Sequence, residues 1–279
     1  MKLFTNNLYV VSTPIGNLDD ITIRALEVLK NSDIILCEDT RRSIKLLSHY
    51  KIKKKLISYH KFNEQKQLAN IIKYSKEGKI LSLVSDAGTP LLSDPGRILV
   101  NECVKNGINV TPIPGVSSIT ASLSVSGFKD QFLFYGFLPK TQNEVEKVLM
   151  ILSENKFTQV FFIPSKKLNF YISNFKKVFS GRKIFIAKEI TKIHETFIRE
   201  DINKLEIFKN SIKGELTVVI SEKNTQAKPI DEKKIVNKIK KYLKNHSLKD
   251  TVNLILETEE IKKKKVYELC LKVKNEKNS

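Results

Sequence analysis

The chain has 279 residues, about twice the usual length of one domain, which predicts two domains. Hydrophobic residues make up 41% and charged residues 28%, as expected for a soluble protein with a sizeable core. The cysteines Cys37, Cys103 and Cys270 lie far apart, which excludes a disulfide scaffold and most structural zinc sites. Residues 1–7 lack a signal-peptide core, and no run approaches the ~18 apolar residues of a membrane span. We therefore expect a cytoplasmic protein with no membrane segment and no metal.

The net charge is +19, from 49 Lys and Arg against 30 Asp and Glu. Only six of the basic residues are Arg, a bias that an AT-rich genome would produce. Residues 226–279 hold 15 basic and 8 acidic residues, so positive charge is densest there. A surface this positive attracts polyanions, and the attraction falls with salt. Charge alone leaves a solvated Lys-rich surface and contact with nucleic acid equally open.

The first part of the chain alternates short apolar runs with amphipathic helical patterns. Strands are expected at 8–11, 33–37, 56–58, 80–84 and 109–113, and helices at 21–30, 40–49, 64–76 and 96–105. Asp19 or Asp20 is expected to cap the first of these helices. Strands and helices that alternate at this spacing favour a parallel sheet with right-handed crossovers.

The same alternation restarts after a stretch around Gly115 and Gly127. Further strands are expected at 132–135, 159–163, 183–187 and 216–220, with helices between most of them. We therefore predict an α/β fold with one domain at 1–117 and a second at 118–225, whose sheets are mostly parallel or mixed.

Residues 226–279 have a different pattern, behind a linker at 223–229. Apolar residues recur at helical spacing in three short stretches, and Ser247 with Asp250 is typical of a capping box. We predict a small all-α appendage, resembling a helix-turn-helix, whose apolar stripes form its own core. Any function of this appendage would then lie on its Lys-rich faces.

Several catalytic motifs are absent from the sequence. There is no G-x-G, no G-x-x-x-x-G-K-[ST], no H-E-x-x-H and no G-x-S-x-G. Their absence argues against dinucleotide binding, P-loop chemistry, zinc hydrolysis and a nucleophile elbow.

Three loops rich in Gly, Pro and small residues directly follow predicted strands. They are V-S-T-P-I-G-N at 11–17, V-S-D-A-G-T-P-L-L-S-D-P-G at 84–96 and P-I-P-G-V-S-S at 112–118. Ligands bind beyond the carboxyl ends of parallel strands, where such loops expose their backbone groups. An ordinary tight turn is a reasonable interpretation of any one of these loops, but the three together favour a binding site. The acidic Glu38, Asp39 and Asp86 at the same ends suit a ligand with hydroxyls and positive charge, and suit a triphosphate poorly.

Ordered segments along the whole chain resemble one family. They are L-Y-V-V-S-T-P-I-G-N-L-D-D-I-T-I-R-A-L-E-V-L from residue 8, C-E-D-T-R from 37, S-L-V-S-D-A-G-T-P-L-L-S-D-P-G from 82, P-I-P-G-V-S-S-I-T-A from 112, Y-G-F-L-P from 135, A-K-E-I-T-K from 187, K-G-E-L-T-V-V-I from 213, S-L-K-D-T-V from 247 and V-Y-E-L-C-L from 266. Together they resemble the tetrapyrrole-methylase-like (class III) S-adenosylmethionine-dependent methyltransferases, in the branch that acts on small-subunit rRNA.

The resemblance implies a fold, a cofactor and a substrate. It implies two α/β domains with S-adenosylmethionine in the cleft between them, and a homodimer. It implies 2′-O-methylation of a cytidine in the decoding region of 16S rRNA within the 30S subunit, with no role for DNA. Two alternatives stay open: a class III methyltransferase acting on a porphyrinoid or another small metabolite, and a non-catalytic RNA-binding ribosome-assembly factor.

The resemblance also suggests site residues. Those expected around the cofactor are Pro14, Asp86, Ala87, Gly88, Thr89, Ser117, Ser118, Ala187 and Leu216. Those expected to contact RNA are Arg41, Lys188 and Lys192, together with Lys262, Lys263, Lys264 and Lys265, which are expected on the ground of the basic tail rather than of the resemblance. A carboxylate near the ribose hydroxyl would act as a general base, and the candidates are Glu38, Asp39 and Glu189. Asp39 could instead cap a strand end, and Glu189 could instead form a structural ion pair with a nearby Lys.

The sequence departs from the family pattern at two places. Where the family usually has F-Y-E-S followed by His-Arg, this chain has F-F-I-P-S-K-K from Phe161, so the Glu is lost. The usual Arg of A-R-E is Lys188, which keeps the charge without the forked geometry. Drift at a structural position and weaker RNA positioning are both compatible with these changes.

Overall fold

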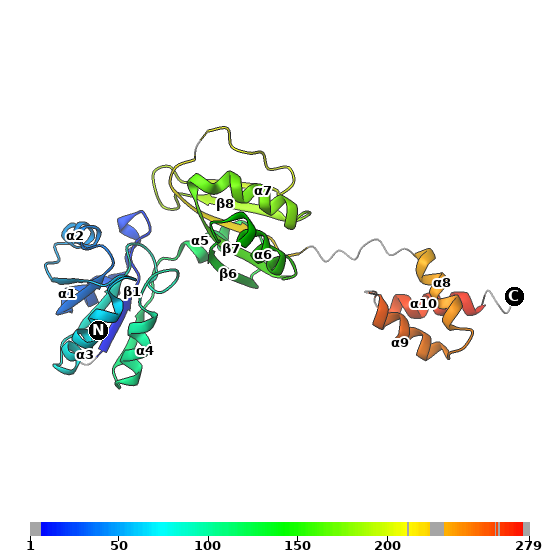
Figure 1. Cartoon of the computed structure of the whole chain (residues 1–279), viewed down its shortest axis with the longest axis horizontal. Helices are drawn as coiled ribbons and strands as arrows, with labels where there is room; N and C mark the ends of the chain where they lie inside the picture. The colour runs from blue at the N-terminus through cyan, green and yellow to red at the C-terminus, as the bar shows by residue number, and fades with distance from the viewer. Residues whose placement is uncertain (1–6, 211, 224–231, 260, 262, 276–279) are drawn as a thin grey trace. The chain divides into compact units, whose positions relative to one another are not determined.

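The computed structural model describes residues 7–210, 212–223, 232–259, 261 and 263–275. The chain divides into two compact units, residues 1–223 and 224–279. Figure 1 shows the elements of both units, which are described separately below. No helix in the described ranges has both the length and the apolar character needed to cross a membrane.

The first sheet is built as the strand–helix alternation predicts. Its strands are β1 (Asn7–Val11), β2 (Ile34–Cys37), β3 (Lys55–Ser58), β4 (Leu81–Val84) and β5 (Asn109–Ile113). They are all parallel, in the order β3-β2-β4-β1-β5. The helices are α1 (Ile23–Asn31), α2 (Thr40–His49), α3 (Glu64–Lys76) and α4 (Arg97–Lys105). The buried strands alternate their side chains between two apolar clusters, one with α1 and α2 and the other with α3 and α4.

The expected cap of the first helix was wrong. Asp19 and Asp20 lie in a short 3-10 helix, η1 (Leu18–Asp20), which Asn17 caps. Thr22 caps α1, because its side-chain oxygen accepts a hydrogen bond from the backbone N–H of Ala25 at 3.1 Å. The extra turn moves the start of the helix beyond the two aspartates.

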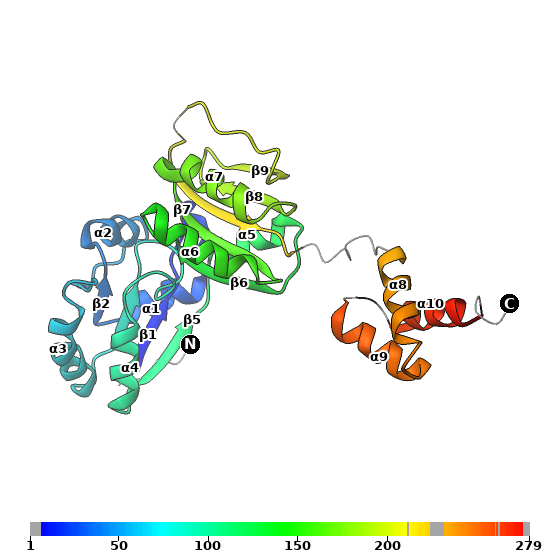
Figure 2. The ribbon, with the colours of Figure 1, turned by 45° about the vertical axis from the view of Figure 1, so that its right-hand side comes forward.

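The second sheet is mixed. Its strands are β6 (Phe132–Phe137), β7 (Thr158–Pro164), β8 (Lys183–Lys188), β9 (Thr196–Asp201) and β10 (Glu215–Ile220), in the order β6-β7-β10-β8-β9. Only β6 and β7 pair in parallel, and the other pairs are antiparallel. Figure 2 shows these strands together with their helices α5 (Ser118–Ser126), α6 (Gln142–Ser153) and α7 (Leu168–Val178); η2 (Ser165–Lys167) is a single turn before α7.

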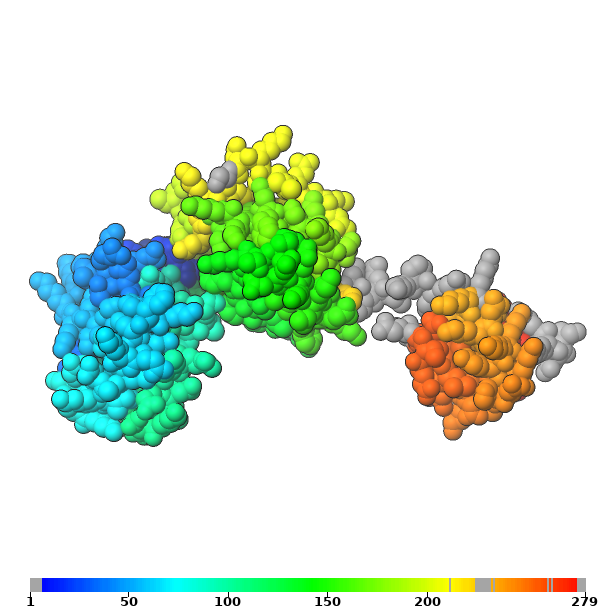
Figure 3. All heavy atoms as spheres, viewed as in Figure 1, coloured from blue at the N-terminus to red at the C-terminus, as the bar shows by residue number. Residues whose placement is uncertain are grey.

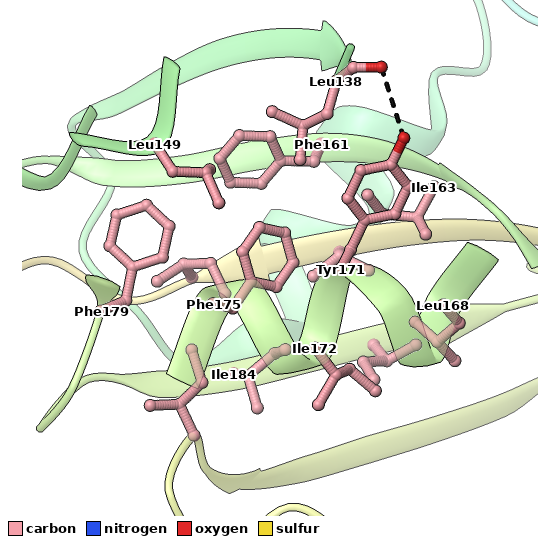
Figure 4. Packing of buried hydrophobic residues seen from close by; sticks show 14 of the residues in the cluster. Leu138, Leu149, Phe161, Ile163, Leu168, Tyr171, Ile172, Phe175, Phe179 and Ile184 are labelled. Atoms are coloured by element: carbon pink, nitrogen blue, oxygen red, sulfur yellow. Dashed lines mark hydrogen bonds between the residues drawn. The ribbon is translucent and has the colours of Figure 1, made fainter. Parts of the chain in front are cut away.

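The two faces of the second sheet pack against different helices. On one face, α6 and α7 bury a large aromatic cluster that includes Phe161, Phe175 and Phe179 (Figure 4). Tyr171 belongs to the same cluster, and its hydroxyl donates to the backbone oxygen of Pro139 at 2.8 Å. On the other face, Ile119 of α5 packs against residues of β7, β8 and β10. The helix that follows the last loop of the first sheet is therefore anchored on the second sheet.

The C-terminal unit is a three-helix bundle, as predicted. Its helices are α8 (Glu232–Tyr242), α9 (Leu248–Thr258) and α10 (Lys263–Asn275), and their apolar stripes form one core. In Figure 3 the atoms of these helices, in orange and red, form one compact group. Ser247 caps α9, because its Oγ accepts from the Asp250 N–H at 3.2 Å; its hydroxyl also donates to the Asp250 carboxylate at 2.6 Å, in place of the backbone bond of a full capping box. The domain boundaries at residues 117 and 225 stay a prediction.

Candidate active site

Hydrogen bonds join the three loops singled out from the sequence. β4, β1 and β5 are neighbours in a parallel sheet, so the loops after them meet at one edge. Thr13 and Gly88 exchange two backbone hydrogen bonds of 2.9 Å. The hydroxyls of Ser12 and Thr89 lie 3.1 Å apart, and Thr89 Oγ1 donates to the backbone oxygen of Val116 at 3.2 Å. The three loops therefore form one structure rather than three separate turns.

A cavity of about 390 Å³ lies beside these loops, within the size range of small-ligand sites. The loops of the first sheet and α2, which holds Arg42, contribute Ile15, Glu38, Arg42, Asp86, Ala87, Gly88, Thr89, Leu92, Ser93 and Asp94. The start of α5 contributes Ser117, Ser118 and Ile119, and the second sheet contributes Phe137, Phe162, Ile163, Pro164, Ala187, Ile190, Gly214, Glu215, Leu216 and Thr217. One wall is thus largely polar and acidic, and the other is largely apolar.

The structure brings most of the predicted cofactor residues together. Eight of the nine line this cavity: Asp86, Ala87, Gly88, Thr89, Ser117, Ser118, Ala187 and Leu216. Pro14 does not line it; it is buried, and its neighbour Ile15 faces the cavity instead. Of the three candidate bases, only Glu38 lines the cavity.

The acidic wall contains two residues that the sequence reasoning missed, Arg42 and Asp94. Arg42 Nη1 lies 3.3 Å from the Asp86 carboxylate, which also accepts the backbone N–H of Asp39 at 3.1 Å. Burial, with the nearby Asp86 charge, raises the pKa of Glu38. Burial, with the Glu38 charge, raises the pKa of Asp94 to about 6. The S-D-P-G end of the second loop was the signal that could have identified Asp94.

Asp39 and Arg41 form a local pair outside the cavity. Asp39 caps α2 by accepting the backbone N–H of Arg41 at 2.9 Å. The Arg41 guanidinium donates two further hydrogen bonds to the same carboxylate, at 3.0 and 2.7 Å. These side-chain and backbone hydrogen bonds from Arg41 lower the pKa of Asp39 to about 2. The geometry fits a capping role for Asp39, at the start of a helix rather than at a strand end, and Arg41 remains largely exposed.

Glu189 and Lys192 form a second pair, in the loop after β8. Glu189 Oε1 accepts from Lys192 Nζ at 2.9 Å and from the backbone N–H of Glu215 at 2.8 Å. Partial burial opposes ionisation, but these two hydrogen bonds outweigh it and hold the pKa of Glu189 below its ordinary value. Both residues line a separate, open depression rather than the cavity. Lys188 ends β8 opposite Leu216 and does not line the cavity either.

The predicted RNA-contacting lysines of the tail differ in their surroundings. Lys262 lies outside the described residues. Lys263 and Lys264 are exposed at the start of α10. Lys265 is partly buried, with its Nζ 2.7 Å from the carboxylate of Glu232. Among the described residues of this lysine run, Lys263 and Lys264 are therefore the two with exposed side chains.

The departure from the family pattern at Ile163 falls in the cavity. Ile163 is buried in the core of the second sheet, pairs in register with Leu216 and contributes to the cavity wall. A carboxylate at this position would therefore be buried beside the site. The next residue, Pro164, ends β7 and also lines the cavity.

Comparison with known proteins identifies the family. The model of the tetrapyrrole (corrin/porphyrin) methylases matches residues 7–206, which contain both sheets except β10. A Thermotoga maritima relative named ribosomal RNA small subunit methyltransferase I is 43% identical over 219 residues, covering 77% of this chain and 98% of the relative. A Buchnera aphidicola relative with the same name is 37% identical over 277 residues, covering 97% of this chain and 98% of the relative.

Solved structures show the same fold at low identity. The uroporphyrin-III C-methyltransferase of Thermus thermophilus, solved in complex with S-adenosylhomocysteine, superposes with a TM-score of 0.56. It is 15% identical, and the match covers 77% of this chain and 97% of that one. The chain therefore belongs to the tetrapyrrole (corrin/porphyrin) methylases, in the group of methyltransferases whose curated members are named ribosomal RNA small subunit methyltransferase I.

Proposed function

We propose that this methyltransferase transfers a methyl group from S-adenosylmethionine to the ribose 2′-hydroxyl of a cytidine in the decoding region of 16S rRNA. The names of its relatives support small-subunit rRNA as the substrate class. The cytidine and the 2′-oxygen are supported by the sequence resemblance, in which C-E-D-T-R distinguishes the rRNA branch. The observation that carries the proposal is the cavity, because it unites the three loops with an acidic and an apolar wall.

The residues around the cavity fit the cofactor's chemistry. S-adenosylmethionine has an adenine ring, a carboxylate and two positive charges, on sulfur and on the amino group. Phe137 and Phe162 provide an apolar surface for a ring, and Glu38 and Asp94 provide negative charge for the cations. At the start of α5, Ser117 makes no side-chain capping bond, which leaves the N–H groups of the first turn open to a carboxylate.

The bound cofactor would supply a methyl group already activated on a positively charged sulfur, so no covalent enzyme intermediate is required. The chain's own contribution is to hold both reactants, which can contribute ~7–11 kcal/mol when they lie at attack distance. Glu38 is the candidate base that faces the cavity, and it would take the hydroxyl proton. The roles of Asp39 in capping α2 and of Glu189 in binding Lys192 make both less suited to that task.

RNA contacts are proposed for Arg41, which is exposed at the start of α2, three residues after Glu38, and for Lys263 and Lys264 in the tail. Double-stranded RNA is recognised mainly by shape and phosphate contacts, which suits lysines on a helix face. We further propose that the protein works as a homodimer in the cytoplasm and acts on rRNA within the 30S subunit. Lys188, at the end of β8, and Lys192, which forms an ion pair with Glu189, are further candidates for RNA contact.

Methyl incorporation from labelled S-adenosylmethionine tests the proposal. The acceptors are 30S subunits from a strain lacking this enzyme, naked 16S rRNA, and porphyrinoid precursors. We expect label in 30S rRNA, on a cytidine ribose after nuclease digestion and mass spectrometry. Label only in the porphyrinoid would support the small-metabolite alternative. Binding to 30S subunits with no incorporation would support a non-catalytic assembly factor.

A further inference from the structure

The side chains that line the cavity are mostly acidic, although the chain as a whole is strongly basic. The protein as a whole carries +19. The described residues that line the cavity include four acidic side chains, Glu38, Asp86, Asp94 and Glu215, against a single basic one, Arg42. Low-dielectric walls strengthen a local field of this kind, so the cavity is set up to attract positive charge within a basic protein.

Two of the four carboxylates have a basic partner in the described part of the chain, whereas Glu38 has none there and Asp94 accepts a hydrogen bond from Ser85 instead. Asp86 lies 3.3 Å from Arg42, and Glu215 lies 3.0 Å from Lys192. Among the described residues, no basic side chain comes within ion-pair distance of Glu38 or Asp94. Both are partly removed from water, and like charges in one cavity repel each other, which makes the empty site unfavourable when both are ionised. A bound cation would relieve this repulsion.

The loop that bears Asp94 is held in a strained conformation. Leu91 and Ser93 have positive φ angles of 72° and 70°, each at a typical cost of ~1–3 kcal/mol. A Cβ on Gly136 of β6 would lie only 2.9 Å from Ser93 Oγ, so the loop packs closely against the second sheet. In this conformation Leu92, Ser93 and Asp94 all line the cavity. Such strain tends to persist where a side chain must face a ligand.

We propose that Asp94, together with Glu38, selects the positively charged sulfonium of S-adenosylmethionine over the neutral thioether of S-adenosylhomocysteine. The inference rests on the proposed function and assigns a specificity role to Asp94, which the sequence analysis did not name as a site residue. During transfer the carbon–sulfur bond breaks and its electron pair stays on sulfur, while a carbon–oxygen bond forms to the ribose and the hydroxyl proton passes to Glu38. The ligand loses one positive charge, so the acidic wall holds the reactant more tightly than the product.

Other charged groups also act on Glu38 and Asp94. Arg42 from α2 and His60 from the loop after β3 favour ionisation of Glu38, whereas Asp86 opposes ionisation of both carboxyls. S-adenosylmethionine and S-adenosylhomocysteine differ in charge only at sulfur, so each of these groups interacts differently with the two ligands only through that charge. The ratio of the two affinities therefore isolates that charge, since the ligands share the adenosine and the amino-acid group.

Calorimetry on the full chain tests the proposal, with S-adenosylmethionine and S-adenosylhomocysteine as probes at pH 7.5. We expect Asp94→Asn to reduce the preference for the sulfonium ligand about tenfold, as one lost charge at short range predicts. Asp94→Glu should keep the preference within threefold of the wild type. Asp130→Asn is the matched control, because Asp130 is exposed and outside the cavity lining, and it should leave the ratio unchanged.

The wild-type protein provides a test that needs no variant. Lowering the pH from 7.5 to 5.0 protonates Asp94, so the preference for the sulfonium ligand should fall in the same direction. An unchanged ratio in Asp94→Asn and in the pH series would overturn the charge-selection role while leaving the proposed function intact. Equal losses in Asp94→Asn and Asp130→Asn would also overturn it. Failure of the wild type to bind either ligand would instead remove the proposed function itself.

Discussion

The backbone N–H of Asn17 donates a hydrogen bond to the side-chain oxygen of Thr191 at 3.0 Å. This bond joins the loop after β1 to the loop after β8, and the residues beside it, Ile15 and Ile190, line the cavity. Glu189 and Thr191 have positive φ angles of 53° and 66°, which an L residue adopts only under constraint. The contact therefore fixes two walls of the site relative to each other.

Gly16→Ala should break this contact. A Cβ at Gly16 would lie 2.7 Å from Thr191 Oγ1 and 2.5 Å from Lys192 Cγ, so the loops must move apart. We expect a loss of about 1–3 kcal/mol in the free energy of unfolding, measured by urea denaturation, and at least a tenfold loss of S-adenosylmethionine affinity. Thr191→Ser, which keeps the accepting hydroxyl, should stay near the wild type in both. Normal affinity in Gly16→Ala would show that the contact does not shape the cavity.

Glu38→Gln should slow methyl transfer far more than it weakens cofactor binding, because Asp94 still provides negative charge for the sulfonium. Removal of a general base typically costs ~10²–10⁴ in rate. Single-turnover kinetics with 30S subunits, alongside calorimetry, separates the two effects. Asp39→Asn is the comparison, since Asp39 caps α2 outside the cavity and its loss should act mainly on stability. Equal rates for Glu38→Gln and the wild type would remove Glu38 from the mechanism.

Asp86→Ala should weaken S-adenosylmethionine binding. The Asp86 carboxylate accepts the Asp39 N–H and pairs with Arg42, so its loss frees Arg42 inside the cavity and adds a net positive charge there. We expect an affinity at least tenfold lower by calorimetry. An unaltered affinity would contradict the placement of the second loop at the cofactor.

The raised pKa of Asp94 predicts how stability depends on pH. Its carboxyl titrates near 6 in the folded protein, above its ordinary value of 3.8, so the folded state binds the proton more tightly than the unfolded state. The contribution of Asp94 to the stability of the folded protein is therefore favourable at low pH, and it is lost as the pH rises toward 6. Asp94→Asn should stabilise the ligand-free protein by about 1–2 kcal/mol at pH 7.5, after allowance for solvent screening, and by nearly nothing at pH 3.5. Thermal unfolding at both pH values checks this, and a variant destabilised at pH 7.5 would contradict it.

Removal of residues 226–279 should weaken rRNA binding and flatten its salt dependence. This segment holds 15 of the 49 basic residues, and each phosphate contact that is lost lowers the salt slope. Binding to 30S subunits across a salt series measures the effect, and S-adenosylmethionine binding to the shortened protein serves as the folding control. An unchanged slope would show that the tail has only a structural role.

Much of the fold followed from local sequence patterns. The helices at 40–49 and 64–76 and the strand at 109–113 have the predicted bounds, because apolar periodicity and caps are local signals. β9 was missed because T-F-I-R-E-D forms an edge strand whose residues are mostly exposed on both faces. α5 was missed because S-I-T-A-S-L-S-V-S is rich in Ser and Thr, which favour turns, and its packing on the second sheet overrides that preference.

The candidate site was only partly predictable for the same reason. The loops were visible because Gly and Pro mark turns wherever they occur in the chain. The role of Glu189 depends on the N–H of Glu215, 26 residues away, and sequence spacing gives no sign of that bond. Asp94 likewise acquires its raised pKa from burial and from Glu38, which lies on a different loop.

A structure of the chain with S-adenosylmethionine bound would examine the central claim most directly. We expect the compound in the cavity, with its sulfonium on the side of Glu38 and Asp94 and its carboxylate at the start of α5. Density for the compound at another place, with this cavity empty, would contradict the proposed function.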